Sequence, residues 1–300
     1  MNLRPTPHQY QRYVLAAGWS LALIVLTGAA VRLTDAGLGC EDWPTCEQGN
    51  VAPAFELHGW IEFGNRLFSG VVAIAVCLAV LTAYRRIPAR LDLIRWAWGL
   101  VAGVIAQILL GGVTVRVGLH PASVAAHYLL SMVLLFNVVV LWFKASGGGP
   151  GATLTVSTTV QNGGRALLAL ATAVAITGTV VTGTGPNGGD DRAERFPFLI
   201  RSVVQIHSVT VWVFLALTIA MVALIRRSPD ASPRLQRFAT VLTITVVAQG
   251  AIGYTQYFTG VTALLVGFHI LGAVSVWIVT VAIYLAMFAR PELETPQQTT

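Results

Sequence analysis

The chain has 300 residues, of which 55% are hydrophobic and only 11% are charged, and its mean hydropathy is +0.70. So few charged residues cannot cover the surface of a soluble protein, which excludes that class. The formal net charge of +6 does not indicate nucleic-acid binding, because the basic residues lie between apolar runs and no soluble domain carries them. The sequence therefore predicts an all-α integral membrane protein.

Eight apolar segments follow one another along the chain, each long enough to cross a bilayer core of roughly 30 Å. They predict transmembrane helices near residues 13–33, 64–84, 95–115, 122–143, 165–183, 200–225, 238–257 and 262–288. Lys and Arg residues cluster between alternate helices, which is the pattern of cytoplasmic loops. We therefore expect a multi-pass protein with both termini cytoplasmic and with long outside loops at 34–63 and 184–199.

An internal repeat relates the two halves of the chain. Three residues of the first half recur 142 positions later with the same spacing: Gln107, Gly111 and His127 match Gln249, Gly253 and His269. The repeat predicts two four-helix bundles, residues 1–146 and 165–300, related by a pseudo-twofold axis along the membrane normal. Residues 147–164 are rich in Gly, Ser and Thr, which favours a flexible cytoplasmic linker.

Three histidines are predicted within the membrane, each about two turns from the outer end of its helix: His127, His207 and His269. A polar ring in the bilayer is costly, so it normally faces the bundle and has a partner. A hydrogen bond between helices explains one such histidine. Three at one depth favour axial ligation of haem, whose iron binds neutral imidazole. We expect His207 and His269 to form a bis-His site.

The first half departs from this pattern, because the position that matches His207 is Asn65. Glu62 lies three residues before Asn65 and Arg66 directly after it, so Glu62 and Arg66 are four residues apart and share a helix face. Glu62 is a candidate catalytic residue, since carboxylates in or near the bilayer are usually functional. The alternative is a structural ion pair between Glu62 and Arg66. Arg66 also suits the bidentate binding of a haem propionate.

Two cysteines, Cys40 and Cys46, lie in the first outside loop, which is an oxidising location in bacteria. The intervening residues, with Pro44 among them, permit a small ring. Two interpretations stay open, a structural disulfide and a redox-active pair beside the site. A zinc site is not expected, because a structural zinc ion needs four ligands.

Several short motifs occur in a fixed order along the chain. They are RLTDAGLGCEDWPTC (32–46), WIEFGNR (60–66), QILLGGVT (107–114) leading to His127, QIH (205–207) and the stretch from Gln249 to His269. Together they resemble the haem A synthase family, membrane enzymes that complete haem A for terminal oxidases. The resemblance covers nearly the whole chain and points to the bacterial branch with cysteines in the first outside loop.

The resemblance implies an oxidoreductase that converts the ring methyl of haem O to the formyl group of haem A by successive hydroxylations. It implies a bacterial plasma membrane, with the haem sites toward the extracytoplasmic side. The partners it implies are haem O delivered by a haem O synthase, an electron donor of unknown identity and the lipid bilayer, and a homo-oligomer is compatible with it.

The resemblance also assigns roles to individual residues. These are His207 and His269 for a haem b cofactor; His127, Asn65 and Arg66 for the haem O site; Glu62 for the chemistry; and Cys40 with Cys46 for a disulfide that is thought to pass electrons or thiol equivalents. Asn65 departs from the family, many members of which have a fourth histidine there. Because an amide is a poor ligand for haem iron, we expect haem O to be five-coordinate through His127, or capped by water or His58.

Two other functions compete with this interpretation. A membrane b-type cytochrome for electron transfer would also use histidine pairs, but it should place haems near both faces of the membrane. A transporter would need a midplane site with broken helices, and no proline interrupts the predicted spans at matching places in the two halves.

Overall fold

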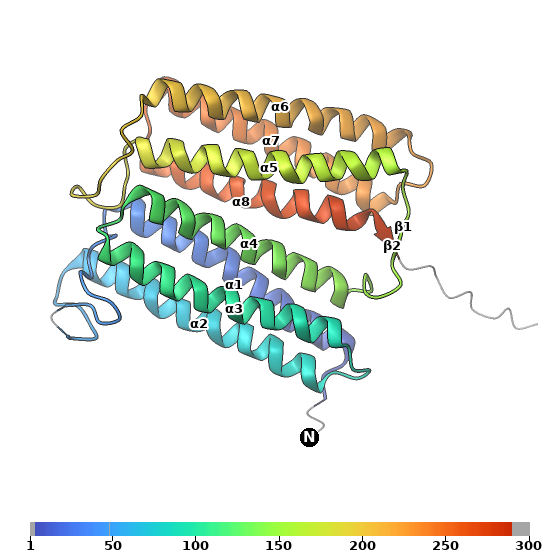
Figure 1. Cartoon of the computed structure of the whole chain (residues 1–300), viewed down its shortest axis with the longest axis horizontal. Coiled ribbons are helices and arrows are strands. Elements are labelled where there is room, and N and C mark those ends of the chain that lie inside the picture. The colour runs from blue at the N-terminus through green and yellow to red at the C-terminus, as the bar shows by residue number, and fades with distance from the viewer. Residues whose placement is uncertain (1–3, 48, 290–300) are drawn as a thin grey trace, which may run out of the picture.

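The computed structural model describes residues 4–47 and 49–289, which form eight long helices and one short sheet (Figure 1). The helices are α1 (Pro7–Leu33), α2 (Leu57–Arg85), α3 (Leu91–Arg116), α4 (Pro121–Ala145), α5 (Thr158–Thr184), α6 (Ile200–Arg227), α7 (Pro233–Thr259) and α8 (Ala263–Ala286). The strands β1 (Thr153–Leu154) and β2 (Phe288–Ala289) pair antiparallel. All eight helices are long and apolar enough to cross a membrane, so this part of the chain is an all-α membrane protein with eight spans, as predicted.

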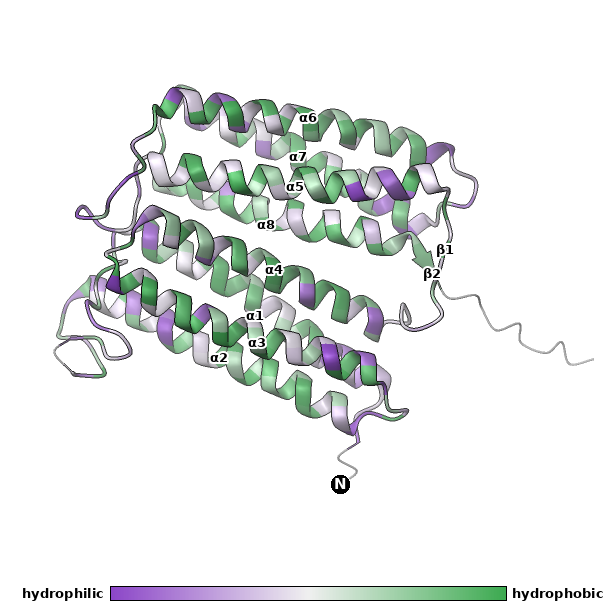
Figure 2. Ribbon diagram, viewed as in Figure 1, coloured by the Kyte–Doolittle hydropathy of each residue, from purple (hydrophilic) through white to green (hydrophobic). Residues whose placement is uncertain are grey.

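The outer faces of the helices are apolar, and polar residues gather at helix ends and in loops (Figure 2). On α2, for example, Leu67, Ile74 and Leu81 are exposed at seven-residue intervals and therefore share one face. A soluble protein rarely exposes a continuous apolar stripe of this kind. Lipid chains are the solvent that such a surface requires.

The helices pack as two bundles, α1–α4 and α5–α8, each with its own cluster of buried apolar residues (Figure 1). Between the bundles, α4 contacts α8, α4 contacts α5, and α1 contacts α8. Exchanging α1 with α5 and α4 with α8 leaves this set of contacts unchanged. A twofold axis that passes between α4 and α8 produces such a pattern, in agreement with the pseudo-twofold axis predicted from the repeat.

The segment predicted as a flexible linker, 147–164, is partly helical. The α5 helix begins at Thr158, because the Ser157 hydroxyl caps it by accepting a backbone hydrogen bond. Gly163 lies inside this helix, where any side chain would clash with Met221 of α6. Gly163 and the adjacent Gly164 thus serve close packing of helices rather than flexibility, and a hydropathy pattern does not distinguish these two uses.

The remaining connection, residues 146–157, is tied to the end of α8. Strand β1 pairs with β2, and Thr155 donates both its backbone N–H and its hydroxyl to the carbonyl of Met287, at 2.9 and 3.0 Å. The sheet lies at the end of the bundles opposite the long loops (Figure 1). We call the end where α1 finishes and α2 begins the loop end.

The α2 helix begins two turns earlier than predicted, so the first long loop covers 34–56 instead of 34–63. The hydropathy of the sequence marks only the part of a helix that the bilayer covers, whereas these two turns are covered by the loop. Gly39 packs directly on the backbone of His58 and Gly59, where a Cβ atom would clash. His58 is therefore a helical residue, and it is exposed.

Three predictions fall partly outside the described residues: the bounds of the two halves and the cytoplasmic placement of both termini. The halves 1–146 and 165–300 include residues 1–3 and 290–300, and the placement of the termini depends on the same segments. These three remain predictions.

Replacing Gly103 with alanine should destabilise the first bundle, because the new Cβ on α3 would clash with the buried Leu134 of α4. Overpacking of this kind costs about 1–3 kcal/mol. Thermal unfolding in detergent measures the effect. Gly64→Ala is the matched control, since its Cβ would meet nothing within 4 Å. An equal loss of stability in both variants would contradict the packing argument.

Candidate functional site

A single cavity of about 2070 Å³ extends through both bundles and is lined by residues of all eight helices. Sites for one small ligand usually have volumes of about 300–1,000 Å³, so this cavity can hold two large ligands. The predicted site residues that line it are Glu62, Asn65, Arg66, His127, His207 and His269. Cys40 and Cys46 lie outside its lining, and so does His58, which removes His58 from the candidate iron ligands.

The two repeat-related histidines have the same surroundings. His127 of α4 faces Gly111 of α3, and His269 of α8 faces Gly253 of α7; a Cβ on these glycines would lie 3.3 and 3.5 Å from the Cε1 atoms of the rings. In both rings Nδ1 is buried without a hydrogen-bond partner among the described residues. The Nε2 atoms are not among the buried atoms, so the ligating nitrogen of each ring is open to the cavity.

The third histidine is oriented by a threonine. His207 of α6 packs against Gly178 of α5, and its Nδ1 lies 3.0 Å from the Thr177 hydroxyl. That hydroxyl donates its only hydrogen to the carbonyl of Ala173 at 2.9 Å, so it accepts from Nδ1–H of the ring. A neutral imidazole protonated on Nδ1 presents the lone pair of Nε2, which is the form that binds iron.

Asn65 occupies the corresponding place in the first bundle. Thr27 of α1 donates to its Oδ1 at 2.8 Å, and a Cβ on Gly28 would lie 3.8 Å from its Nδ2. Thr27 and Gly28 thus contact Asn65 at the places where Thr177 and Gly178 contact His207, although Thr27 donates its hydrogen bond and Thr177 accepts one. The sequence analysis missed both threonines, each of which directly precedes its glycine.

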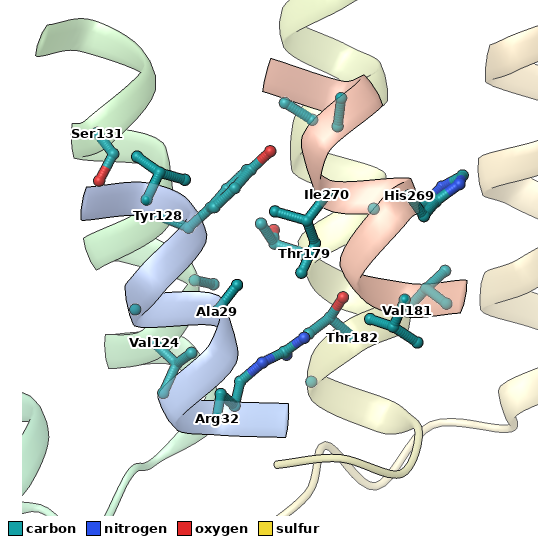
Figure 3. A pocket seen from close by; sticks show the side chains of 18 of the residues that line it. Ala29, Arg32, Val124, Tyr128, Ser131, Thr179, Val181, Thr182, His269 and Ile270 are labelled. Carbon is teal, nitrogen blue, oxygen red and sulfur yellow. The ribbon is translucent and has the colours of Figure 1, made fainter. Parts of the chain in front are cut away.

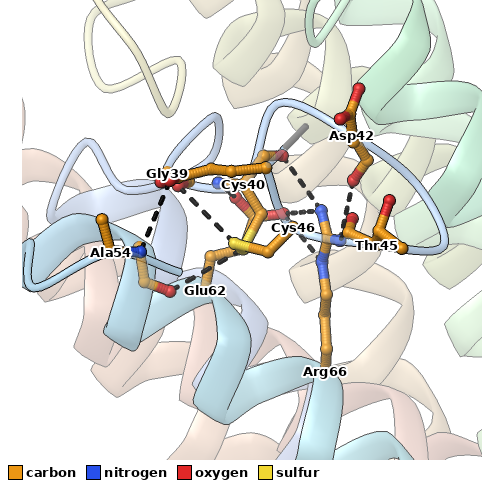
Figure 4. Close-up of a disulfide and its surroundings, with 10 residues drawn as sticks. Gly39, Cys40, Asp42, Thr45, Cys46, Ala54, Glu62 and Arg66 are labelled. Atoms are coloured by element: carbon orange, nitrogen blue, oxygen red, sulfur yellow. Dashed lines mark hydrogen bonds and ion pairs between the residues drawn. A yellow bond between two sulfur atoms is a disulfide. The ribbon is translucent and has the colours of Figure 1, made fainter. Parts of the chain in front are cut away.

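A disulfide joins Cys40 and Cys46 in the loop 34–56, and Glu62 lies directly beneath it (Figure 4). Only 6% of Glu62 is exposed, and its Oε2 accepts a hydrogen bond of 2.8 Å from the backbone N–H of Cys40. Glu62 also forms the ion pair with Arg66 that the spacing predicted as an alternative. The carboxylate therefore both lines the cavity and anchors the loop.

Arg66 uses all five of its N–H groups within this network (Figure 4). Its Nε donates to Glu62 Oε1 at 3.1 Å, and one Nη2 hydrogen bonds the same oxygen. The other three donate to the backbone carbonyls of Cys40, Asp42 and Thr45 at 2.9–3.1 Å. Its guanidinium thus has no donor left for the haem propionate that the sequence suggested.

The same loop covers the first bundle. Trp43 and Pro44 line the cavity, and the Trp43 ring lies on Gly112 of α3, where a Cβ would be 2.6 Å from the ring. The guanidinium of Arg116 lies 5.7 Å from the centre of this ring and donates to the Trp43 carbonyl at 3.1 Å. This disulfide-bonded segment therefore covers the loop end of the first bundle, and we call it the lid.

Outside the membrane-spanning helices, a second contact links the loops of the two bundles. Arg192, in the loop 185–199, forms ion pairs with Asp190 and with Glu41 of the disulfide loop. Hydrogen bonds from Arg192 hold the pKa of Asp190 below its ordinary value. The backbone N–H of Gly37 also donates to the carbonyl of Gly189 at 2.8 Å. These contacts hold the two loops together.

Comparison with known proteins identifies relatives of the first five helices. Residues 11–58 and 51–187 match the COX15-CtaA family, described as cytochrome oxidase assembly proteins. This region contains the disulfide loop, Glu62, Asn65 and His127. It does not reach His207 or His269.

Individual relatives are named heme A synthase. The chain is 30% identical to the protein from Lysinibacillus sphaericus over 138 residues, which are 44% of this chain and 45% of that protein. It is 36% identical to the Geobacillus kaustophilus protein over 110 residues, which are 35% of this chain and 33% of that protein. It is 28% identical to the Shewanella oneidensis protein over 184 residues, which are 54% of this chain and 52% of that protein.

The matched regions thus span between a third and about half the length of these relatives. The family match itself is more extensive. Since it covers more than half of the chain, including the lid and the first bundle, this protein belongs to the cytochrome oxidase assembly protein family.

Proposed function

We propose that this protein is a haem A synthase, which oxidises the ring methyl of haem O to the formyl group of haem A. One observation carries the proposal: three imidazoles with open Nε2 atoms, and an asparagine in the fourth equivalent place, line one large apolar cavity. The name of the relatives agrees with this function. Haem iron held at such a site would supply the oxidising chemistry, by successive hydroxylations with dioxygen as the oxidant and electrons from an external donor.

The second bundle suits a resident haem b. His207 and His269 come from α6 and α8, which do not contact each other and lie diagonally across the bundle, and the two rings are close enough to interact electrostatically. Thr177 fixes the tautomer of His207 so that Nε2 points its lone pair away from α5. Glycines beneath both rings leave room for a flat group between the helices.

The first bundle suits the substrate. His127 offers one ligand, whereas the Asn65 amide is held by Thr27 and is a poor ligand for iron. One face of a haem O bound there would remain open for reaction. Trp43 and Pro44 of the lid exclude water from this part of the cavity.

Glu62 is the residue that we expect to hold and move protons in the first bundle. It is the one carboxylate among the described residues that line the cavity. The Arg66 guanidinium and the N–H of Cys40 fix its two oxygens. Because the same hydrogen bonds hold the lid, the disulfide and this carboxylate are coupled, whether Cys40 and Cys46 serve a structural or a redox role.

The charge distribution suggests how the protein lies in a bacterial plasma membrane. Arg85, Arg86, Arg226 and Arg227 end their helices opposite the loop end, as cytoplasmic residues would. The loop end, with the disulfide and the iron sites, then faces the extracytoplasmic side. We expect haem O from a haem O synthase and an external electron donor as partners.

The direct test is to purify the protein from cells that supply haem O and to extract its haems. We expect haem A together with haem b. Haem b alone, after aerobic expression with haem O present, would overturn the proposal and favour a membrane cytochrome. Chromatography and mass spectrometry of the extract distinguish the three haems.

Replacing Asn65 with histidine should add the missing ligand and close the open face of the substrate. We expect a second low-spin haem in the optical and EPR spectra, and haem A formation lower by about tenfold or more, because the sixth position is filled. Asn65→Ala is the matched control, since it keeps the position open. A first-bundle haem that is already low-spin and bis-His in the unsubstituted protein would contradict the assignment.

Glu62→Gln should preserve haem binding and the contact with Cys40 but remove the proton acceptor. Loss of a general acid or base typically costs about 10²–10⁴-fold in rate. Haem A yield measures the effect, and the rate at which Cys40 and Cys46 are alkylated after mild reduction reports whether the lid is still closed. Glu47→Gln, which alters another loop carboxylate bonded to a backbone N–H, is the control. Full activity of Glu62→Gln would leave Glu62 a purely structural role.

A further inference from the structure

Two arginines line the cavity where the bundles meet. Arg32 ends α1, and Arg195 lies in the loop 185–199. Among residues 4–47 and 49–289, neither guanidinium has a hydrogen bond or an ion pair in the structure, and the two are close enough to repel each other. Figure 3 shows the Arg32 side chain extending from α1 toward Thr182 of α5, into the space between the bundles.

Three of the other arginines at this end already have partners, while Arg201, which also lines the cavity, is an exposed residue in the first turn of α6. Arg66 donates to Glu62 and the lid, Arg116 donates to the lid and lies on Trp43, and Arg192 pairs with Asp190 and Glu41. A cation inside a largely apolar cavity is costly unless an anion pairs with it. Arg32 and Arg195 therefore form a site of double positive charge that no carboxylate of the described chain neutralises.

The loop backbone holds these two side chains in place. The Arg195 guanidinium lies directly on Gly188, where any Cβ would clash with it. Gly189 adopts a positive φ of 106°, and a Cβ there would lie 3.1 Å from Cγ of Arg32. Both glycines thus leave the space that the arginines occupy, so the pair is built into the fold.

The position of Arg32 fits the anionic end of a ligand whose iron lies deeper in the membrane. Arg32 is four residues beyond Gly28, which packs against Asn65, and four residues span about 6 Å along a helix. Arg32 therefore leaves α1 about one helical turn closer to the loop end than Asn65, the counterpart of the proposed ligand His207. The Tyr128 side chain also points into this space, and it is close enough to Arg32 to interact electrostatically (Figure 3).

We infer that Arg32 and Arg195 bind the carboxylate groups of the haem held in the first bundle, the role that the sequence suggested for Arg66. The inference rests on the proposed function, since it takes an iron porphyrin as the ligand. Guanidinium groups bind carboxylates through paired, charge-assisted hydrogen bonds. Two such groups suit a ligand that carries two carboxylates on one edge.

The test is to titrate the full chain, purified without haem, with haemin and with haemin dimethyl ester, which lacks both charged carboxylates. The Soret band reports binding of each. We expect Arg32→Gln and Arg195→Gln each to weaken haemin binding about tenfold, the size of one charged hydrogen bond, and to leave ester binding unchanged. Arg226→Gln, which removes an exposed arginine at the opposite end of α6, should change neither affinity.

The outcomes separate this inference from the proposed function. If the unsubstituted chain binds haemin and its ester equally, or if both arginine variants weaken the two ligands by one common factor, the carboxylate site is wrong while haem binding stands. If the unsubstituted chain binds neither ligand, both proposals fail. If Arg32→Gln does not fold, Arg32→Lys and Arg195→Gln test the inference instead. Arg32→Lys should keep part of the preference for haemin over its ester. Arg195→Gln should reduce that preference.

Discussion

The close contact between an imidazole and a glycine on the next helix is the constraint on which this structure depends. It occurs three times, at His127, His207 and His269, and each contact leaves the Nε2 atom open to the cavity. A Cβ at Gly111 or Gly178 would lie 3.3 or 3.2 Å from the ring, so that the imidazole would have to shift by a few tenths of an ångström, whereas at Gly253 it would just touch the ring. The twofold packing of the bundles then places these contacts at similar depth, so that one cavity joins two related sites.

The two bundles differ where they meet the loop end. The first bundle has Asn65 in place of a histidine, and it carries the lid that Glu62 and Arg66 hold. The loop 185–199 of the second bundle is shorter, and it supplies Arg195 to the shared cavity. Symmetry thus provides two places for a large ligand, and departures from symmetry give them different chemistry.

Much of the fold could be predicted from hydropathy, because a membrane helix must be apolar over its whole span. The beginnings of α2 and α5 could not, since protein rather than lipid covers their first turns. The repeat located His127 and Asn65. It could not reveal the partners of Arg66, because three of them are carbonyls of the loop 34–56 and a helical spacing shows only the pairing with Glu62. Thr27 and Thr177 were missed because they lie 150 positions apart, whereas the histidines follow an interval of 142.

Arg66 couples the conformation of the lid to the charge of the buried Glu62 carboxylate, because its one planar guanidinium donates hydrogen bonds to both. Three of its hydrogens bind loop carbonyls and two bind Glu62, so neither set can be lost without disturbing the other. In evolutionary terms, residues of this loop are not free to drift as ordinary surface residues do. On the role proposed for Glu62, a change that loosens the loop would also alter proton chemistry in the cavity, even though the altered residue does not touch the ligand.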